Sequence, residues 1–336
     1  MRTKLLSLFG IAVSAGIIFY MASQFDIAQT KTIFSQAKIE WLIMAAVLYL
    51  ALFPLRGLRW SWLLTNIKPI PVSTSTQTLV IGAMANNILP ARLGDVVRAY
   101  LLSRRAKLPA TATFSNVLLE RIIDGCTVIA LLSGVLIFAP PDNDWVGPLG
   151  ASMAGLFFLA LGACVLLATK PELFWKLLGP FLRRLPKGLA SKVENKLDLL
   201  LRGIQVLAQP STMLRIALIS LLIWGSEAVI YLVCQQAFGL TIPLSGGILV
   251  MAVLTLGLTA PSGPGFVGVF EGLIVASVSL YGVAPSEGLA FAIAMHLIHY
   301  VPVTVIGVAY VWRTGLQLRQ LRAEASQTMT ASHGGA

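Results

Sequence analysis

Long apolar runs along the chain predict helices that cross a membrane. The runs at 5–25 and 149–169 carry no charged residue, and the run at 288–312 is interrupted only by two histidines. Each reaches the roughly 20 residues that a transmembrane helix needs. Because the first run is longer than the apolar part of a signal peptide, we expect it to remain in the protein as an uncleaved helix.

Three further runs hold charged residues yet keep the length and apolar character of membrane-spanning helices. They lie at 41–64, 113–139 and 213–238. Two other stretches, 78–103 and 245–282, are apolar enough for the bilayer but are broken in the middle by proline and glycine. The pattern therefore predicts an all-α, polytopic transmembrane helical bundle with two interrupted segments.

Composition supports a membrane protein and excludes other classes. Apolar residues make up 57% of the 336 residues and charged residues 12%, which leaves too little polar surface for a water-soluble globule. The three cysteines show no CxxC spacing, so we expect packed thiols rather than a disulfide scaffold. We interpret the net charge of +11 as a marker of cytoplasmic loops, and we expect no nucleic acid as a partner.

The distribution of Lys and Arg predicts which way the helices face. About twenty of the 25 Lys and Arg can be placed on one side, including Arg56 and Arg59 near the end of the run at 41–64. Both termini are then cytoplasmic, in a multi-pass protein of the cytoplasmic (inner) membrane. The broken stretch at 78–103 then enters the membrane from the cytoplasmic side and returns to that side. The stretch at 245–282 enters from the opposite side and returns there. Each is expected to be a re-entrant hairpin or a pair of full spans.

A single membrane domain is predicted over 1–319, followed by a disordered cytoplasmic tail at 320–336. Within the domain, the charged segment at 170–212 has apolar residues at helical spacing opposite its lysines and arginines. We expect a basic amphipathic helix on the cytoplasmic leaflet, and a solvated helical linker is the alternative.

The two broken stretches share a spacing of residues at their breaks. Each has a proline, a glycine four residues later and then a carboxylate: Pro90, Gly94 and Asp95 in the first, and Pro264, Gly268 and Glu271 in the second. Paired interruptions in the two halves of a membrane protein indicate an inverted repeat with a binding site at its interface.

The half-helix ends at these breaks favour an anion. Unpaired backbone N–H groups and the positive end of the helix dipole point into the protein there. Arg92 and Arg98 add positive charge that can hold phosphate oxygens in bidentate fashion. We therefore expect a membrane lipid with an anionic, phosphate-bearing headgroup as the ligand. The alternative is a pair of tolerated helix kinks, with Arg92 and Asp95 forming a local ion pair.

Polar side chains recur on one face of three predicted membrane helices, and these faces are expected to line a cavity rather than to meet lipid. They comprise Asn116, Glu120, Asp124 and Thr127 with Arg121 beside them; Ser220, Trp224, Glu227, Tyr231 and Gln235; and His296, Tyr300 and Thr304 with His299 beside them. Glu227 is expected either to pair with an arginine or to act in catalysis or coupling. The two histidines lack nearby ligands in the sequence, so we expect no metal site but a hydrogen-bonded contact or proton handling.

The apolar stretches contain more acidic residues than basic ones. Five acids stand against three arginines, Arg92, Arg98 and Arg121. An excess of negative charge is costly in a low dielectric. We therefore expect protonated carboxylates or a cationic group on the substrate.

Three segments carry a resemblance to a known family: NILPARLGD at 87–95 followed by Arg98, LERIID at 119–124, and PSGPGFVG at 261–268 followed by Glu271. They resemble the lysylphosphatidylglycerol synthase transmembrane-region family of flippase-like membrane proteins, over about residues 5–315. The third segment departs from the family's more glycine-rich form by carrying bulkier residues.

Full-length enzymes of that family join this membrane region to a cytosolic aminoacyltransferase domain. Because little chain follows the last predicted span, we expect no such domain here and do not extend lipid aminoacylation to this chain. The resemblance implies a lipid translocase, and stand-alone members have been linked to export of lipids, polyprenyl-linked glycans or hopanoids.

These observations predict a flippase-like protein without enzymatic activity or cofactor, which handles an anionic or aminoacylated lipid or a polyprenyl-linked headgroup in a midplane cavity. The alternatives are an intramembrane lipid-modifying transferase and a non-catalytic partner that recruits a lipid- or glycan-modifying enzyme through the segment at 170–212. The residues expected at the headgroup cavity are Asn86, Asn87, Pro90, Arg92, Gly94, Asp95, Arg98, Glu120, Arg121, Asp124, Glu227, Pro261, Gly263, Pro264, Gly265, Gly268 and Glu271. Proton handling is expected at His296, His299 and Tyr300.

Overall fold

The computed structural model is helical throughout the part of the chain that it describes, which confirms the predicted all-α membrane bundle. The described residues are 26–65, 67–89, 93–141, 170–182, 209–259 and 264–313, with isolated positions at 16 and between 148 and 194. The spans predicted at 5–25 and 149–169, most of the basic segment at 170–212 and the tail at 320–336 lie outside these residues.

Four described helices are long and apolar enough to cross a membrane. They are α3 (Ile39–Leu64), α6 (Ala110–Phe138), α10 (Pro210–Gln235, continued by the 3-10 turn η3, Gln236–Phe238) and α13 (Pro285–Arg313). Their outward faces carry large apolar side chains, such as Val47, Leu218 and Val305, each more than half exposed. Exposed apolar surface on this scale indicates contact with lipid rather than water.

Two hairpins of shorter helices lie between these long helices. The first consists of α4 (Val72–Ile88) and α5 (Gly94–Ala106), and the second of α11 (Leu244–Gly257), the 3-10 turn η4 (Pro264–Phe266) and α12 (Val269–Ser279). At 1.5 Å per residue even the 17-residue α4 is only about 26 Å long, less than a hydrocarbon core of about 30 Å. Both stretches are therefore helix–break–helix units, and their re-entrant insertion stays a prediction.

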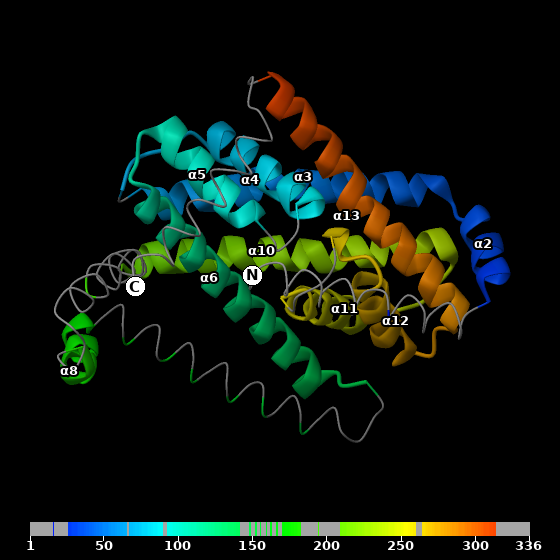
Figure 1. Ribbon diagram of the computed structural model, residues 1–336. Coiled ribbons are helices and arrows are strands. Elements are labelled where there is room, and N and C mark those ends of the chain that lie inside the picture. Colours follow the sequence, from blue (N-terminus) through cyan, green and yellow to red (C-terminus); the bar gives the residue numbers. More distant parts are fainter. Residues whose placement is uncertain are drawn as a thin grey trace.

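The packing of the helices repeats between the two halves of the chain (Figure 1). When α3, α4, α5 and α6 are matched in order with α10, α11, α12 and α13, each half packs its first helix on its second, its second on its third and its third on its fourth. Between the halves, α3 packs on α10, and the contact of α4 with α13 is matched by that of α11 with α6. This is the arrangement expected of an internal structural repeat.

Outside this repeat, two helices are described at its edges. Helix α2 (Ile27–Ser35) packs on α13, and the Asp26 side chain caps its start by accepting from the Gln29 backbone N–H at 2.9 Å. Helix α8 (Pro171–Leu182) lies within the basic segment. None of the side chains that the structure describes on these two helices lines the cavities described below.

The glycines at the breaks permit geometries that larger residues would not. In the first hairpin, a Cβ on Gly94 would lie 2.0 Å from the carbonyl oxygen of Gly82, so α4 and α5 meet backbone to backbone. In the second, Gly265 and Gly268 both have positive φ, at 71° and 85°, which glycine adopts without steric cost. Phe266 shares this left-handed conformation, with φ at 62°. The second break is therefore tightly folded backbone rather than a simple helix kink.

Candidate functional site

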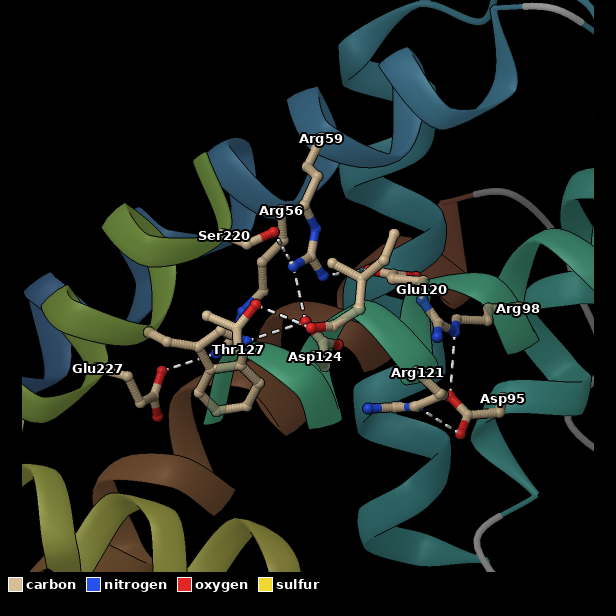
Figure 2. A network of polar contacts seen from close by, with 12 residues as sticks. Arg56, Arg59, Asp95, Arg98, Glu120, Arg121, Asp124, Thr127, Ser220 and Glu227 are labelled. Atoms are coloured by element: carbon tan, nitrogen blue, oxygen red, sulfur yellow. Dashed lines mark hydrogen bonds and ion pairs between the residues drawn. The ribbon is translucent and has the colours of Figure 1, made fainter. Parts of the chain in front are cut away.

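A buried arginine on α3 joins the two halves at the centre of the bundle. The Arg59 guanidinium lies 3.0 Å from Glu120 Oε1 and 2.6 Å from Asp124 Oδ1, and it donates to the Ser220 hydroxyl at 3.1 Å. Trp224 donates its indole N–H to the same Asp124 oxygen at 3.0 Å. Arg59 is 1% exposed, so its charge is balanced by protein groups and not by water (Figure 2). Removing one partner from such a cluster would leave an uncompensated buried charge.

The same network continues to a more open end at the first break. Arg98 bonds Glu120 Oε2 through Nη1 and Asp95 Oδ1 through Nε, the latter at 3.1 Å. Arg121 grips both oxygens of Asp95, at 2.6 and 3.0 Å (Figure 2). The side chains of Arg121 and Asp95 are 46% and 28% exposed, in contrast to 4% for Arg98. The Arg121–Asp95 pair is therefore the accessible end of the network.

A second cluster pairs glutamates with histidines. Glu227 accepts from Arg56 at 2.7 Å and lies 2.8 Å from His299 Nε2. Glu271 lies in hydrogen-bond contact with His296 Nδ1. These pairs link α10 to α13 and α12 to α13, respectively. We call them the glutamate–histidine pairs.

Hydrogen bonds close the first break and tie it to α13. Asn86 accepts from the Gly94 backbone N–H at 2.7 Å and so closes the first break. Asn87 donates to the Thr304 hydroxyl at 2.9 Å, and the Tyr300 hydroxyl donates to the Asn87 carbonyl at 3.5 Å. Because α4 also packs on η4, the first break, the second break and α13 meet at this point.

Two neighbouring cavities open onto these clusters, with volumes of about 200 Å³ and about 120 Å³. Arg56, Arg121 and Trp224 line both cavities and form the wall between them. The larger cavity is bordered by Asn87, Glu227, His296, His299 and Tyr300 together with several aromatic rings. The smaller cavity is bordered by Asn86, Asp95, Arg98, Glu120 and Asp124. The arrangement offers a chamber rich in arginine beside a chamber rich in histidine and aromatic groups.

Most of the residues predicted at the site lie at these cavities or bond to residues that line them. Those brought together are Asn86, Asn87, Gly94, Asp95, Arg98, Glu120, Arg121, Asp124, Glu227, Gly265, Gly268, Glu271, His296, His299 and Tyr300. Pro90, Arg92, Pro261 and Gly263 lie outside the described residues, and Pro264 is described only as part of η4. Lipid binding by any of them stays a prediction.

The structure corrects the prediction for Arg56 and Arg59. They were counted among the charges of the cytoplasmic side, near the end of the run at 41–64. Helix α3 ends at Leu64, as that run does, but both side chains lie in the interior of the bundle. The predicted excess of five acids over three arginines is therefore wrong, because two more arginines neutralise the same carboxylates. The sequence did hold a signal for this position of the two arginines. Arg56 and Arg59 are three residues apart within an apolar run, which places both on one helix face. Of the two roles expected for Glu227, pairing with an arginine is confirmed by Arg56.

Among the described residues, no group of three or more metal-binding side chains comes together. The chemistry that the site offers is therefore that of guanidinium, carboxylate and imidazole groups. Guanidinium groups bind phosphate or carboxylate in bidentate fashion, and imidazole accepts and donates protons near neutral pH.

Comparison with known proteins agrees with this architecture. A family model described as "Lysylphosphatidylglycerol synthase TM region" matches residues 7–307. A UPF0104 membrane protein of Methanothermobacter thermautotrophicus is 26% identical over 314 residues, covering 89% of this chain and 91% of that protein. A second UPF0104 membrane protein of the same organism is 23% identical and covers 91% and 92% of the two chains.

A longer relative carries a name that includes an activity. Glycosyltransferase AglD of Haloferax volcanii is 23% identical over 354 residues, covering 96% of this chain. The chain spans only 57% of the length of that relative. The similarity therefore extends over the membrane region described above and leaves a large part of the relative unmatched.

Proposed function

This chain belongs to the lysylphosphatidylglycerol synthase transmembrane-region family of integral, multi-pass membrane proteins, and from that premise we propose that it moves a lipid with an anionic headgroup across the bilayer. The observation that carries the proposal is the Arg121–Asp95 pair, the accessible end of an otherwise buried charge network inside a membrane bundle. Ionisable groups at such a depth are costly and mark pathways for polar substrates.

The headgroup site is proposed at Arg121, between the two cavities. Arg59 and Arg98 are buried and each bonds two carboxylates, whereas Arg121 is exposed and holds the accessible Asp95. A phosphate presents the same bidentate oxygen geometry as a carboxylate, so it can replace Asp95 on Arg121. Asp95 then keeps its bond to Arg98, and no charge is left without a partner. The acyl chains stay in the lipid that surrounds the apolar outer faces.

The proposal also includes the side of the membrane from which each hairpin enters. With both termini in the cytoplasm of a cytoplasmic-membrane protein, the hairpin α4–α5 inserts from the cytoplasmic side and α11–α12 from the opposite side. A headgroup at Arg121 would then lie between two hairpins that face opposite leaflets. Alternating movement of the repeats around a fixed site is the usual mechanism of such proteins.

An intramembrane transferase is the second candidate. It is favoured by the name of one relative, Glycosyltransferase AglD, and by imidazole and carboxylate groups that share one cavity. A transferase would change the lipid covalently, whereas a translocase changes only the leaflet in which the lipid resides. Mass spectrometry of membrane lipids from cells with and without the protein separates the two.

A translocation assay tests the proposal. Purified protein is reconstituted into vesicles that contain fluorescent phosphatidylglycerol, and the fraction accessible to a membrane-impermeant quencher is followed. Arg121→Gln should slow translocation about tenfold to a hundredfold, because a hydrogen bond to a charged group contributes about 1.5–3 kcal/mol. Arg104→Gln, on the exposed side of α5, is the matched control and should leave the rate unchanged. Equal rates for the two variants would contradict a headgroup site at Arg121.

A further inference from the structure

Each histidine of the larger cavity has a hydrogen-bond acceptor at both ring nitrogens. His299 Nδ1 lies 2.8 Å from the carbonyl oxygen of Met295, and its Nε2 lies 2.8 Å from Glu227 Oε1. His296 Nε2 lies 2.8 Å from the carbonyl oxygen of Gly265, and its Nδ1 meets Glu271 Oε1. The two residues are therefore bound in the same way, by one backbone carbonyl and one glutamate each.

This geometry requires an additional proton in each pair. A backbone carbonyl only accepts, so the nitrogen that faces it must carry a hydrogen. A neutral imidazole has no second N–H, and an ionised carboxylate has none to donate. The contact between the other nitrogen and the glutamate therefore needs one more proton, on the imidazole or on the carboxyl group. Each glutamate–histidine pair in the structure thus corresponds to a proton-loaded state.

The surroundings act on the two protons in opposite ways, because neighbouring guanidinium groups repel added positive charge and neighbouring aromatic rings favour it. Arg56 of α3 faces Glu227 of α10, and Arg121 of α6 lines the same cavity. Rings of Tyr49 and Tyr231 flank His299 with centroids at 4.4 and 5.9 Å. On the other side, Phe270 of α12 stacks on His296 at 4.4 Å and Tyr300 of α13 lies at 5.9 Å. The face of an aromatic ring is electron-rich and favours a nearby cation.

We propose that the larger cavity is a two-proton binding site, with one proton on the Glu227–His299 pair and one on the Glu271–His296 pair, and that proton binding is coupled to the lipid movement proposed above. Loading adds two positive charges beside Arg56 and Arg121, so an anionic headgroup and the two protons bind cooperatively. By linkage, the headgroup also strengthens proton binding by the same factor. Protons and anionic lipid therefore cross in the same direction. This inference rests on the proposed function.

The second break supplies the structural link between protonation and movement. When the Glu271–His296 pair releases its proton, His296 can keep only one of its two hydrogen bonds. If the bond to Gly265 is lost, the break that contains Phe266 in its left-handed conformation loses a hydrogen bond to α13. Such a conformation persists in a residue with a Cβ only where the surroundings enforce it. Proton release thus frees the hairpin α11–α12 to move.

A pH gradient across reconstituted vesicles tests the coupling through its stoichiometry. With fluorescent phosphatidylglycerol as the probe and the membrane potential held at zero by potassium and valinomycin, a difference of one pH unit should change the equilibrium ratio between leaflets about tenfold for each coupled proton, hence about a hundredfold for two. His296→Gln or His299→Gln should reduce the change to about tenfold, and the double variant should abolish it. Translocation in the wild type with a ratio that ignores the gradient would overturn the proton coupling while leaving the proposed function intact.

A spectroscopic measurement on the unmodified protein tests the protons without any variant or transport. The chain has three histidines, two of them in the cavity, so ¹⁵N-histidine and ¹³C-carboxyl-glutamate labels give few signals of interest by nuclear magnetic resonance in lipid nanodiscs. At neutral pH each pair should show either an imidazolium or a protonated glutamic acid. Neutral imidazoles beside ionised carboxylates would overturn the proposal. An absence of lipid translocation alongside two loaded pairs would contradict the proposed function and the coupling, but not the proton site.

Discussion

The residue with the greatest structural consequence is Arg59, a cation that is almost completely enclosed. Its two carboxylate partners, Glu120 and Asp124, come from α6, and its hydroxyl partner, Ser220, comes from α10. One side chain thus joins three long helices and both halves of the repeat. The network is stable only while cations and carboxylates stay matched, because water cannot solvate a charge left behind.

Arg59→Gln should therefore destabilise the protein by about 3–5 kcal/mol, the usual effect of removing one partner from a buried ion pair. Thermal unfolding in detergent, followed by fluorescence, measures the loss as a lower midpoint. Arg215→Gln, an exposed arginine on α10, is the matched control and should change stability by no more than about 0.5 kcal/mol. If the two variants unfold at the same temperature, the network has no structural role.

Individual residues also show how far the sequence could predict the site. The polar face of α6 was predictable, because Glu120 and Asp124 are separated by one helical turn. Their partner Arg59 was not, because it lies 61 residues before Glu120, and helical periodicity carries no information about contacts at that distance. The same holds for Glu227, whose partner Arg56 is 171 residues away.

At the scale of the secondary structure elements, the two hairpins depend on close approach of their helices. In the first hairpin the backbone of Gly94 faces that of Gly82, and Asn86 closes the break between them. Proline and glycine in the sequence predicted where the helices break. They could not predict that Asn87 and Tyr300 would join the first break to α13, because that contact depends on how α4 packs on α13.

Gly94→Ala should separate α4 from α5, because its Cβ would lie within 2.0 Å of the Gly82 carbonyl oxygen. We expect a loss of about 1–3 kcal/mol, typical of overpacking, together with slower lipid translocation. Gly134→Ala in α6 is the control, since no atom lies within 4 Å of the added Cβ, and alanine should stabilise this helix by up to about 1 kcal/mol. Unfolding midpoints of the two variants in detergent provide the comparison. A Gly94→Ala protein as stable as the wild type would contradict the close packing.

At the scale of the whole molecule, the two halves share one arrangement of helices but differ in the residue that pairs with the carboxylate of the hairpin. In the first half the carboxylate at the start of α5, Asp95, pairs with Arg121 of the following long helix. In the second half the corresponding Glu271 of α12 pairs with His296 of α13. The first half thus offers a permanent positive charge and the second a charge that depends on protonation. In the mechanism that we propose, the anion binds at Arg121, which lines both cavities, and the protons bind in the larger cavity.

In each hairpin, the helix ends that lie away from the break are called the open ends. If the two hairpins enter from opposite sides, their open ends must face opposite sides of the membrane. In the first hairpin these ends lie together, since Lys68 donates to the Ala106 carbonyl at 2.9 Å. In the second, a Cβ on Gly246 would lie 3.1 Å from the Tyr281 ring, which brings the ends of α11 and α12 together. The two pairs of ends can therefore be probed separately.

The most direct measurement is cysteine labelling with a membrane-impermeant maleimide in intact and permeabilised cells. Single cysteines are introduced into a cysteine-free protein at exposed positions next to the open ends, Thr65→Cys and Ala110→Cys for the first hairpin and Thr241→Cys and Ala284→Cys for the second. The first pair should react only after permeabilisation, and the second pair should react in intact cells. Labelling of all four positions from the same side would contradict the inverted arrangement and with it the two-sided chamber.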